Sequence, residues 1–211
     1  MLREPRMDGE GFARLVGLMR RLLGPDGCPW DREQTPETLR PYVIEEAYEV
    51  VDAIDGGQQE ALREELGDLL LQVVFLSEMA RERGWFDVDR VIEGISEKLV
   101  RRHPHVFADG TAETADAVVE SWEAIKRAEK KGRGTLDGVP VAMPALLRAV
   151  RIGEKAARVG YDWEDAAGAR AKVDEELGEL DGATDHEDEA RELGDLLFAL
   201  ASWARKRKHD P

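Results

Sequence analysis

The chain has 211 residues, of which 42% are hydrophobic and 36% are charged, and its formal net charge is −15. A surface this acidic repels polynucleotides, which excludes non-specific nucleic-acid binding and admits a small anionic substrate only where a cation screens it. Cys28 is the single cysteine, so no intramolecular disulfide forms, and without a signal segment or a long apolar run we expect a soluble, cytoplasmic protein with no membrane partner.

Apolar residues recur at helical spacing along nearly the whole chain, and no alternating run predicts a strand, so the sequence predicts an all-α fold. In the first half, helices are predicted at about 12–23, 36–55, 60–83, 88–102 and 115–131, with a polar loop at 26–35. Pro36 suits the first turn of its helix because its φ is fixed. The 60–83 helix is apolar on much of its circumference, so we expect it to be central.

The helical pattern restarts after a segment rich in glycine and proline. Residues 132–143 predict a linker, and helices follow at about 146–159, 167–182 and 187–208. A Tyr161-Asp162-Trp163 loop then takes the position that Trp30-Asp31 has in the first half. We therefore expect a first unit at 1–131 and a second, shorter unit at 144–211 that is truncated at its C-terminus.

An acidic pattern occurs once in each half of the chain. Glu45-Glu46-Ala-Tyr-Glu49 precedes Glu65-Leu-Gly-Asp68, and Glu175-Glu176-Leu-Gly-Glu179 precedes Glu192-Leu-Gly-Asp195. The offset between the copies is 130 residues for the first part and 127 for the second, so the length difference falls in the loop between the two acidic helices. Loops tolerate such changes, and duplication of a helical hairpin is the simplest account.

These carboxylates predict a cation site in each copy. Acidic residues three apart share one face of a helix, so two packed helices bring four of them together. The predicted ligands are Glu46, Glu49, Glu65 and Asp68, and again Glu176, Glu179, Glu192 and Asp195. A solvated acidic face is the alternative, but Asp68 follows Leu66 and precedes a run of leucines, where an unpaired charge is costly. Gly67, a poor residue for a helix interior, suggests that something approaches the backbone closely.

The ligand set favours Mg²⁺, with Mn²⁺ as an alternative. The sequence has no Glu-x-x-His motif of the di-iron type and no cluster of Cys or His that would suggest zinc. Carboxylates alone suit hard divalent ions, and Mg²⁺ commonly accompanies phosphate groups. Lys98, Arg101 and Arg102 share a helix face and would bind phosphate, although a basic helix end that complements the helix dipole explains them equally well. Trp30 is expected to fill a core rather than stack on a base.

Several stretches in fixed order resemble the MazG family of nucleoside triphosphate pyrophosphohydrolases, and the likeness covers nearly the whole chain. They are 28–35 (CPWDREQT), 45–50 (EEAYEV), 65–70 (ELGDLL), 98–107 (KLVRRHPHVF), 122–126 (WEAIK) and 159–163 (VGYDW). The resemblance implies two tandem MazG-type units with helices arranged as in a four-helix bundle, and assembly into homodimers or higher homo-oligomers. It also implies Mg²⁺-dependent hydrolysis of (d)NTPs to the monophosphate and pyrophosphate, as in house-cleaning of nucleotide pools.

The expected mechanism combines this reaction with the residue pattern. Glu45 lies one residue off the metal-binding face and is the expected group to orient or deprotonate the attacking water, while the basic trio stabilises the leaving pyrophosphate. The second copy lacks obvious phosphate-binding partners unless another subunit or the 206–208 basic tail supplies them, so we expect the first unit to hold the complete site. A non-catalytic acidic scaffold that binds cations or a protein is one alternative. A related enzyme specific for one nucleotide, such as dUTP or phosphoribosyl-ATP, is another.

Overall fold

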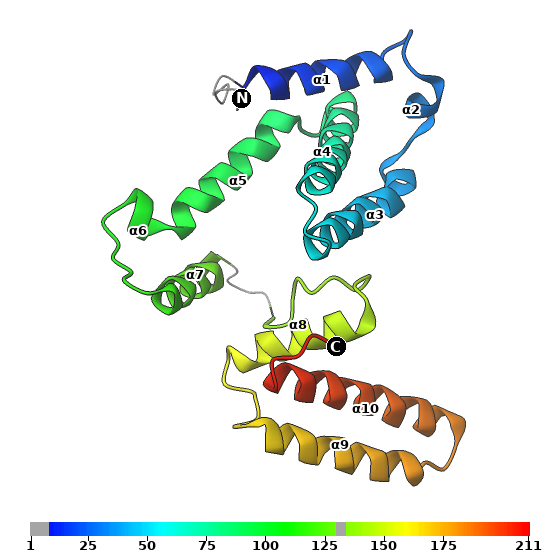
Figure 1. Cartoon of the computed structure of the whole chain (residues 1–211), viewed down its shortest axis with the longest axis vertical. Helices are drawn as coiled ribbons and strands as arrows, with labels where there is room; N and C mark the ends of the chain where they lie inside the picture. The colour runs from blue at the N-terminus through cyan, green and yellow to red at the C-terminus, as the bar shows by residue number, and fades with distance from the viewer. Residues whose placement is uncertain (1–8, 130–133) are drawn as a thin grey trace. The chain divides into compact units, whose positions relative to one another are not determined.

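The structure is a computed structural model, and it describes residues 9–129 and 134–211. The chain divides into two compact units, Met1–Ile125 and Lys126–Pro211. Within the described ranges every regular element is a helix and no strand is present, which confirms the all-α prediction (Figure 1). The expected linker at 132–143 begins in the segment 130–133, which lies outside the described residues.

The helices of the first unit agree closely with the predicted ones. They are α1 (Glu10–Leu23), α2 (Pro29–Glu33), α3 (Pro36–Asp55), α4 (Gln59–Glu82), α5 (Val88–Arg102), α6 (Pro104–Phe107) and α7 (Ala115–Glu129), the last of which runs past the boundary between the units. The predicted polar loop at 26–35 is in part helical, because it contains α2. A helix of five residues is too short to show an apolar period, so the sequence pattern gave no sign of it.

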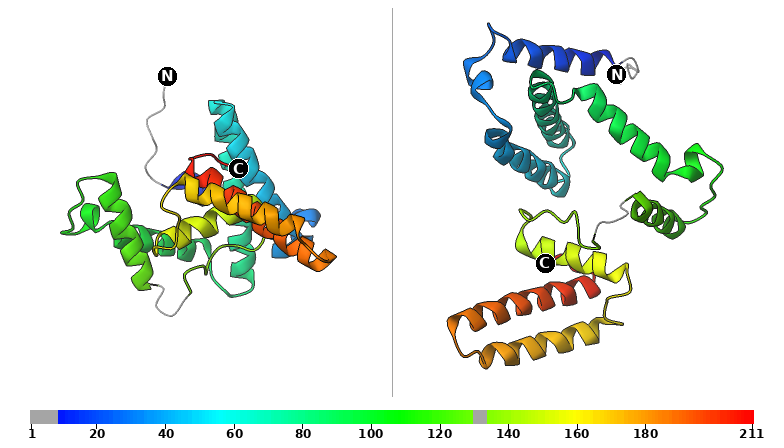
Figure 2. Two further views of the ribbon diagram at one scale, coloured as in Figure 1. Left: turned by 90° about the horizontal axis from the view of Figure 1, so that it is seen from below. Right: turned by 180° about the vertical axis from the view of Figure 1, so that it is seen from behind.

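The α3–α4 hairpin is the main framework of the first unit. Pro36 occupies the first turn of α3, as predicted, and Thr35 and Thr38 exchange backbone-to-side-chain hydrogen bonds of 3.3 and 2.8 Å in a capping box. Gly57 has a φ of 64° in the short turn that follows α3, a conformation that favours glycine. The two long helices lie side by side in all views (Figures 1 and 2).

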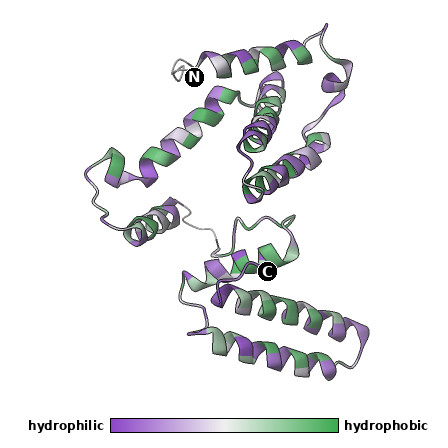
Figure 3. Ribbon diagram, viewed as in Figure 1, coloured by the Kyte–Doolittle hydropathy of each residue, from purple (hydrophilic) through white to green (hydrophobic). Residues whose placement is uncertain are grey.

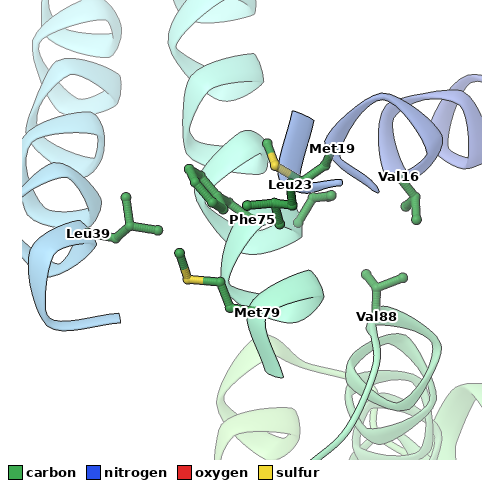
Figure 4. Close-up of a cluster of buried hydrophobic side chains, with 8 residues drawn as sticks. Val16, Met19, Leu23, Leu39, Phe75, Met79 and Val88 are labelled. Atoms are coloured by element: carbon green, nitrogen blue, oxygen red, sulfur yellow. The ribbon is translucent and has the colours of Figure 1, made fainter. Parts of the chain in front are cut away.

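The core of the first unit lies where α1 crosses the C-terminal half of α4. Its buried residues come from α1, α3, α4 and the start of α5, and they are Val16, Met19, Leu23, Leu39, Val74, Phe75, Met79 and Val88 (Figure 4). Glu78 is also fully buried there and accepts hydrogen bonds from Arg20 of α1 and Arg81 of α4. This core holds one end of the α3–α4 hairpin, while the acidic residues lie toward the other end.

The second unit is a three-helix arrangement of α8 (Ala145–Ala157), α9 (Ala166–Asp181) and α10 (His186–Lys206). Helix α10 packs against both α8 and α9, and its small core comprises Val173, Leu196 and Ala199. Asp165 and Asp185 cap the N-termini of α9 and α10 by accepting backbone N–H bonds.

Helix α4 is central, as expected, because it contacts α1, α3 and α5, but its N-terminal half is not buried. Side chains at helical spacing on α3 and α4 remain 40–50% exposed, and we call them the α3–α4 stripe: Ile44, Tyr48, Val51, Leu66, Leu70 and Val73. Figure 3 shows the hydrophobic residues distributed along these helices. The apolar run around Asp68 is therefore only partly covered within one chain, contrary to our expectation. No helix among the described residues is long and apolar enough to cross a membrane.

Candidate metal centre

The hairpin brings three of the predicted ligands of the first unit together. Glu46 and Glu49 lie on α3 and Glu65 lies on α4, and one carboxylate oxygen from each falls within 4.8 Å of the others. The spacing of three residues places the two α3 carboxylates on one face, and the antiparallel pairing of the helices adds the third. We call Glu46, Glu49 and Glu65 the first cluster.

The first cluster has an unbalanced negative charge. Partial burial raises the pKa of Glu46, and the neighbouring carboxylates of Glu49 and Asp68 raise it further. Burial likewise raises the pKa of Glu65, again with contributions from the charges of Glu49 and Asp68. Among the described residues no Lys or Arg forms an ion pair with these four carboxylates. Because these carboxylates repel one another and lack a counter-charge from the described part of the protein, a bound cation would stabilise them.

Asp68 and Glu45 lie beside the first cluster but outside it. Asp68 is half-buried one turn further along α4, and its charge acts on both Glu46 and Glu65. Glu45 is exposed and directly precedes Glu46 on α3. Among the described residues nothing approaches the backbone of Gly67, since a Cβ at this position would meet no atom within 4 Å.

The second unit repeats the arrangement at lower exposure. Glu176 and Glu179 on α9 and Glu192 on α10 bring one carboxylate oxygen each within 4.8 Å of the others, and we call them the second cluster. Glu176 and Glu192 are buried, whereas Asp195 is exposed and lies outside the cluster. Burial raises the pKa of Glu192, which the nearby Arg191 opposes and the charge of Glu179 reinforces.

Two basic side chains that the sequence analysis did not predict form ion pairs with the second cluster. Lys172 Nζ lies 2.6 Å from Glu176 Oε1 and 2.9 Å from Glu175 Oε1, and Arg191 lies 2.6 Å from Glu192 Oε1. Arg191 also pairs with Asp188. The hydrogen bonds that the Lys172 ammonium donates to Glu176 and Glu175 raise the pKa of Lys172. Lys172 lies four residues before Glu176, a spacing at which side chains on a helix form ion pairs, and this spacing could have indicated the contact from the sequence.

The predicted phosphate-binding residues are not brought to the first cluster within one chain. Lys98, Arg101 and Arg102 lie in the last turns of α5, which leaves the C-terminal end of α4 and makes no contact with α3 (Figure 1). The Arg102 guanidinium instead lies 5.9 Å from the ring centre of Trp122.

Trp30 and the basic tail, which the sequence analysis also considered, contact other side chains of their own unit. Trp30 does not fill a core, contrary to expectation: it is 52% exposed and meets the Tyr42 ring edge-on at 6.3 Å. From the basic tail, Lys206 pairs with Asp162 at 3.1 Å, next to Arg205, and so holds the loop before α9 against the end of α10. Lys206 is therefore engaged at the opposite end of α10 from the second cluster.

Comparisons with known proteins point to one family. Residues 34–107, which contain the whole first acidic pattern, match the MazG nucleotide pyrophosphohydrolase domain. A Thermotoga maritima protein named "Nucleoside triphosphate pyrophosphohydrolase/pyrophosphatase MazG" is 46% identical over 202 residues, which cover 95% of this chain and 78% of that protein. The Escherichia coli K12 "Nucleoside triphosphate pyrophosphohydrolase" is 47% identical over 201 residues, which cover 91% of this chain and 76% of the relative.

Among solved structures, the crystal structure of a mazG-related protein from Thermotoga maritima aligns with a TM-score of 0.48 at 26% identity, over 55% of this chain and 98% of that chain. The family assignment rests on the sequence comparisons. Identity of this level over most of both chains shows that the protein belongs to the MazG family of nucleotide pyrophosphohydrolases.

Proposed function

We propose that this protein is an enzyme that hydrolyses nucleoside triphosphates to the monophosphate and pyrophosphate, in the manner of a house-cleaning enzyme of nucleotide pools. The observation that carries the proposal is the convergence of Glu46, Glu49 and Glu65 within 4.8 Å on a hairpin that belongs to a MazG domain. The names of the curated relatives support the reaction. The acidic surface of the chain agrees with a small nucleotide as substrate rather than a nucleic-acid polymer.

The first cluster fits Mg²⁺, with Mn²⁺ as an alternative. Its donors are carboxylate oxygens only, and no cation in the described part of the chain balances their charges. Asp68, one turn away on α4, is the proposed fourth ligand. When bound, the ion supplies charge neutralisation at the phosphate oxygens and a lowered pKa for a coordinated water. The second cluster, with Asp195 beside it, is proposed to hold the same kind of ion.

Two further roles, activation of the water and stabilisation of the leaving group, are proposed for residues outside the cluster. Glu45, exposed beside the first cluster, orients the attacking water or accepts its proton. Lys98, Arg101 and Arg102 stabilise the leaving pyrophosphate. Because α5 does not contact α3 in a single chain, these cations reach the cluster only when α5 moves or when a second copy contributes them.

Two features of the assembly belong to the same proposal. The two units are tandem MazG-type hairpins, which the recurrence of the acidic cluster in both supports. The protein forms a homodimer or a higher homo-oligomer, which the exposed α3–α4 stripe supports, because a row of six large apolar side chains is costly to leave in water.

Pyrophosphate release from a panel of NTPs and dNTPs, with and without Mg²⁺, tests the reaction. We expect Mg²⁺-dependent release that falls at least about a hundredfold in Asp68→Asn, since a metal-bound phosphate transition state loses a ligand charge. Glu60→Gln, on the exposed start of the same helix, is the matched control and keeps wild-type turnover. Absence of release from every nucleotide would contradict the enzyme assignment, and a single strongly preferred nucleotide would point to a specialised relative.

Hydrolysis in ¹⁸O-labelled water tests the point of attack. Attack at the α-phosphorus places the label in the monophosphate, and label in pyrophosphate would refute it. A comparison of Glu49→Ala with Glu179→Ala tests which unit is active. We expect Glu49→Ala to abolish turnover, and loss of turnover in Glu179→Ala alone would assign the activity to the second unit.

A further inference from the structure

We propose that Lys172 is a built-in counter-ion of the second cluster, and that a divalent ion must displace it from Glu176 before it binds there. The inference rests on the proposed metal-binding role of both clusters. Its consequence is that the two acidic clusters of one chain, although alike in their carboxylates, differ in divalent-ion affinity, the first being the stronger site.

The contacts of Lys172 carry the first step. Its ammonium lies 2.6 Å from Glu176 Oε1 and 2.9 Å from Glu175 Oε1, so one cation forms ion pairs with two adjacent carboxylates. Glu176 is only 4% exposed, and its second oxygen, Oε2, is buried without a hydrogen-bond partner. The lysine thus pairs with one oxygen of a buried carboxylate and leaves the other oxygen without a hydrogen-bond partner, which is an incomplete substitute for a metal ion.

The first unit lacks this device at the corresponding positions. With the offset of 130 residues between α3 and α9, Lys172 corresponds to Tyr42, and with the offset of 127 between α4 and α10, Arg191 corresponds to Glu64. Tyr42 is uncharged and meets Trp30 edge-on. The first cluster consequently has no internal cation among the described residues, whereas the second has one on each of its helices.

Lys172 also contacts Glu175, the counterpart of the residue that is proposed to act on the attacking water. Glu175 corresponds to Glu45, the residue proposed to orient the attacking water in the first unit. A lysine paired with Glu175 competes with any water for that carboxylate. When a divalent ion takes Glu176, Lys172 retains Glu175 as a partner, so its displacement costs one charge-assisted contact rather than two.

Mn²⁺ binding to the full chain, with free Mn²⁺ followed by electron paramagnetic resonance, tests the proposal. Glu49→Ala disables the first cluster and isolates the second, and Lys172→Met is then added to it. We expect Lys172→Met to tighten Mn²⁺ binding at the second cluster about tenfold, the size of one charge-assisted hydrogen bond. Lys172→Arg keeps the positive charge and is the matched control, with affinity within about threefold of the parent on the same reasoning.

The reciprocal experiment places the cation in the first unit. In a Glu179→Ala background, Tyr42→Lys should weaken Mn²⁺ binding at the first cluster by about tenfold, while Tyr42→Phe leaves it unchanged. This arm decides the question if Lys172→Met loses helical circular dichroism. Unchanged affinity in Tyr42→Lys, or in a folded Lys172→Met, overturns the counter-ion role and leaves the proposed function intact. Absence of Mn²⁺ binding in the wild type overturns the metal role itself, and this inference with it.

Discussion

At the scale of single residues, Glu78 is a fully buried charge in the first unit. Its side chain is fully buried in α4, and Oε2 accepts hydrogen bonds from Arg20 Nε at 3.0 Å and Arg81 Nε at 2.6 Å. The contact with Arg20 joins α1 to α4 beside the core, at the end of the hairpin remote from the acidic cluster. A buried carboxylate without these partners would carry a large desolvation cost.

Glu78→Gln should lower the free energy of unfolding by about 2 kcal/mol, because the amide replaces a charge-assisted acceptor with a neutral one. This loss is smaller than is usual when a buried ion pair is broken. The side chains of Arg20 and Arg81 are 50% and 40% exposed, so water solvates their charges in the variant. Urea unfolding followed by circular dichroism measures it. Glu60→Gln, which breaks an exposed pair with Arg63, should change stability by less than about 0.5 kcal/mol. Equal effects of the two substitutions would argue against a special role for Glu78.

The same residue predicts a pH dependence. Burial raises the pKa of Glu78, but the hydrogen bonds from Arg20 and Arg81 outweigh burial and hold the pKa below its usual range. A pKa that is lower in the folded state stabilises the fold above the unfolded-state pKa, about 4.3, and that stabilisation disappears as the pH falls through the folded-state value. The difference in unfolding free energy between wild type and Glu78→Gln should therefore be constant near neutrality and shrink under acid. A difference that grows on acidification would contradict the assignment.

At the scale of elements, the start of α3 fixes the register of the helix that carries Glu46 and Glu49. Thr35→Ala removes the side-chain acceptor for the Thr38 N–H and should cost about 1 kcal/mol of stability. Thermal unfolding measures the loss, and Thr35→Ser, which keeps the hydroxyl, should behave as wild type. Equal melting temperatures for the alanine and serine variants would show that Pro36 alone sets the start of the helix.

The long helices were predictable because their local signals agree. Pro36, the apolar period and the glycines after Asp55 all indicate a single helix, and α3 has the predicted bounds. The carboxylate clusters were also predictable, because a spacing of three residues determines the helix face before any tertiary contact is known. Helices α2 and α6, of five and four residues, were not, since so few residues show no period.

Other features depend on what packs against a helix face, which periodicity does not specify. Leu66 and Leu70 have the spacing of core residues, yet they are 49% and 40% exposed because nothing in the described ranges covers that face. Lys172 was missed for a different reason. The acidic pattern specifies carboxylates alone, and it does not indicate that the lysine one turn before Glu176 is their counter-charge.

At the scale of the whole molecule, the two units differ in the apolar surface beside their clusters. The α4 part of the α3–α4 stripe recurs on α10, where Leu193, Leu197 and Leu200 are also exposed. The α3 part does not recur, because Ile44, Tyr48 and Val51 correspond to Asp174, Gly178 and Asp181 on α9. The first unit therefore offers the larger apolar surface to a second copy, and a substitution there should have the stronger effect on self-association.

Val73→Lys places a charge in the α3–α4 stripe, away from the buried core residues of α4, and should weaken the proposed homodimer at least about tenfold, since a symmetric interface buries the unpaired charge twice. Light scattering coupled to size exclusion, over a dilution series, measures the mass, and circular dichroism confirms that the helices remain. Val141→Lys is the matched control, because Val141 is 80% exposed and lies outside the stripe. A wild-type chain that is monomeric at every concentration, or a Val73→Lys chain that dimerises like the wild type, would show that the stripe is not the subunit interface. In that case the cations of α5 would have to reach the first cluster by a movement within one chain.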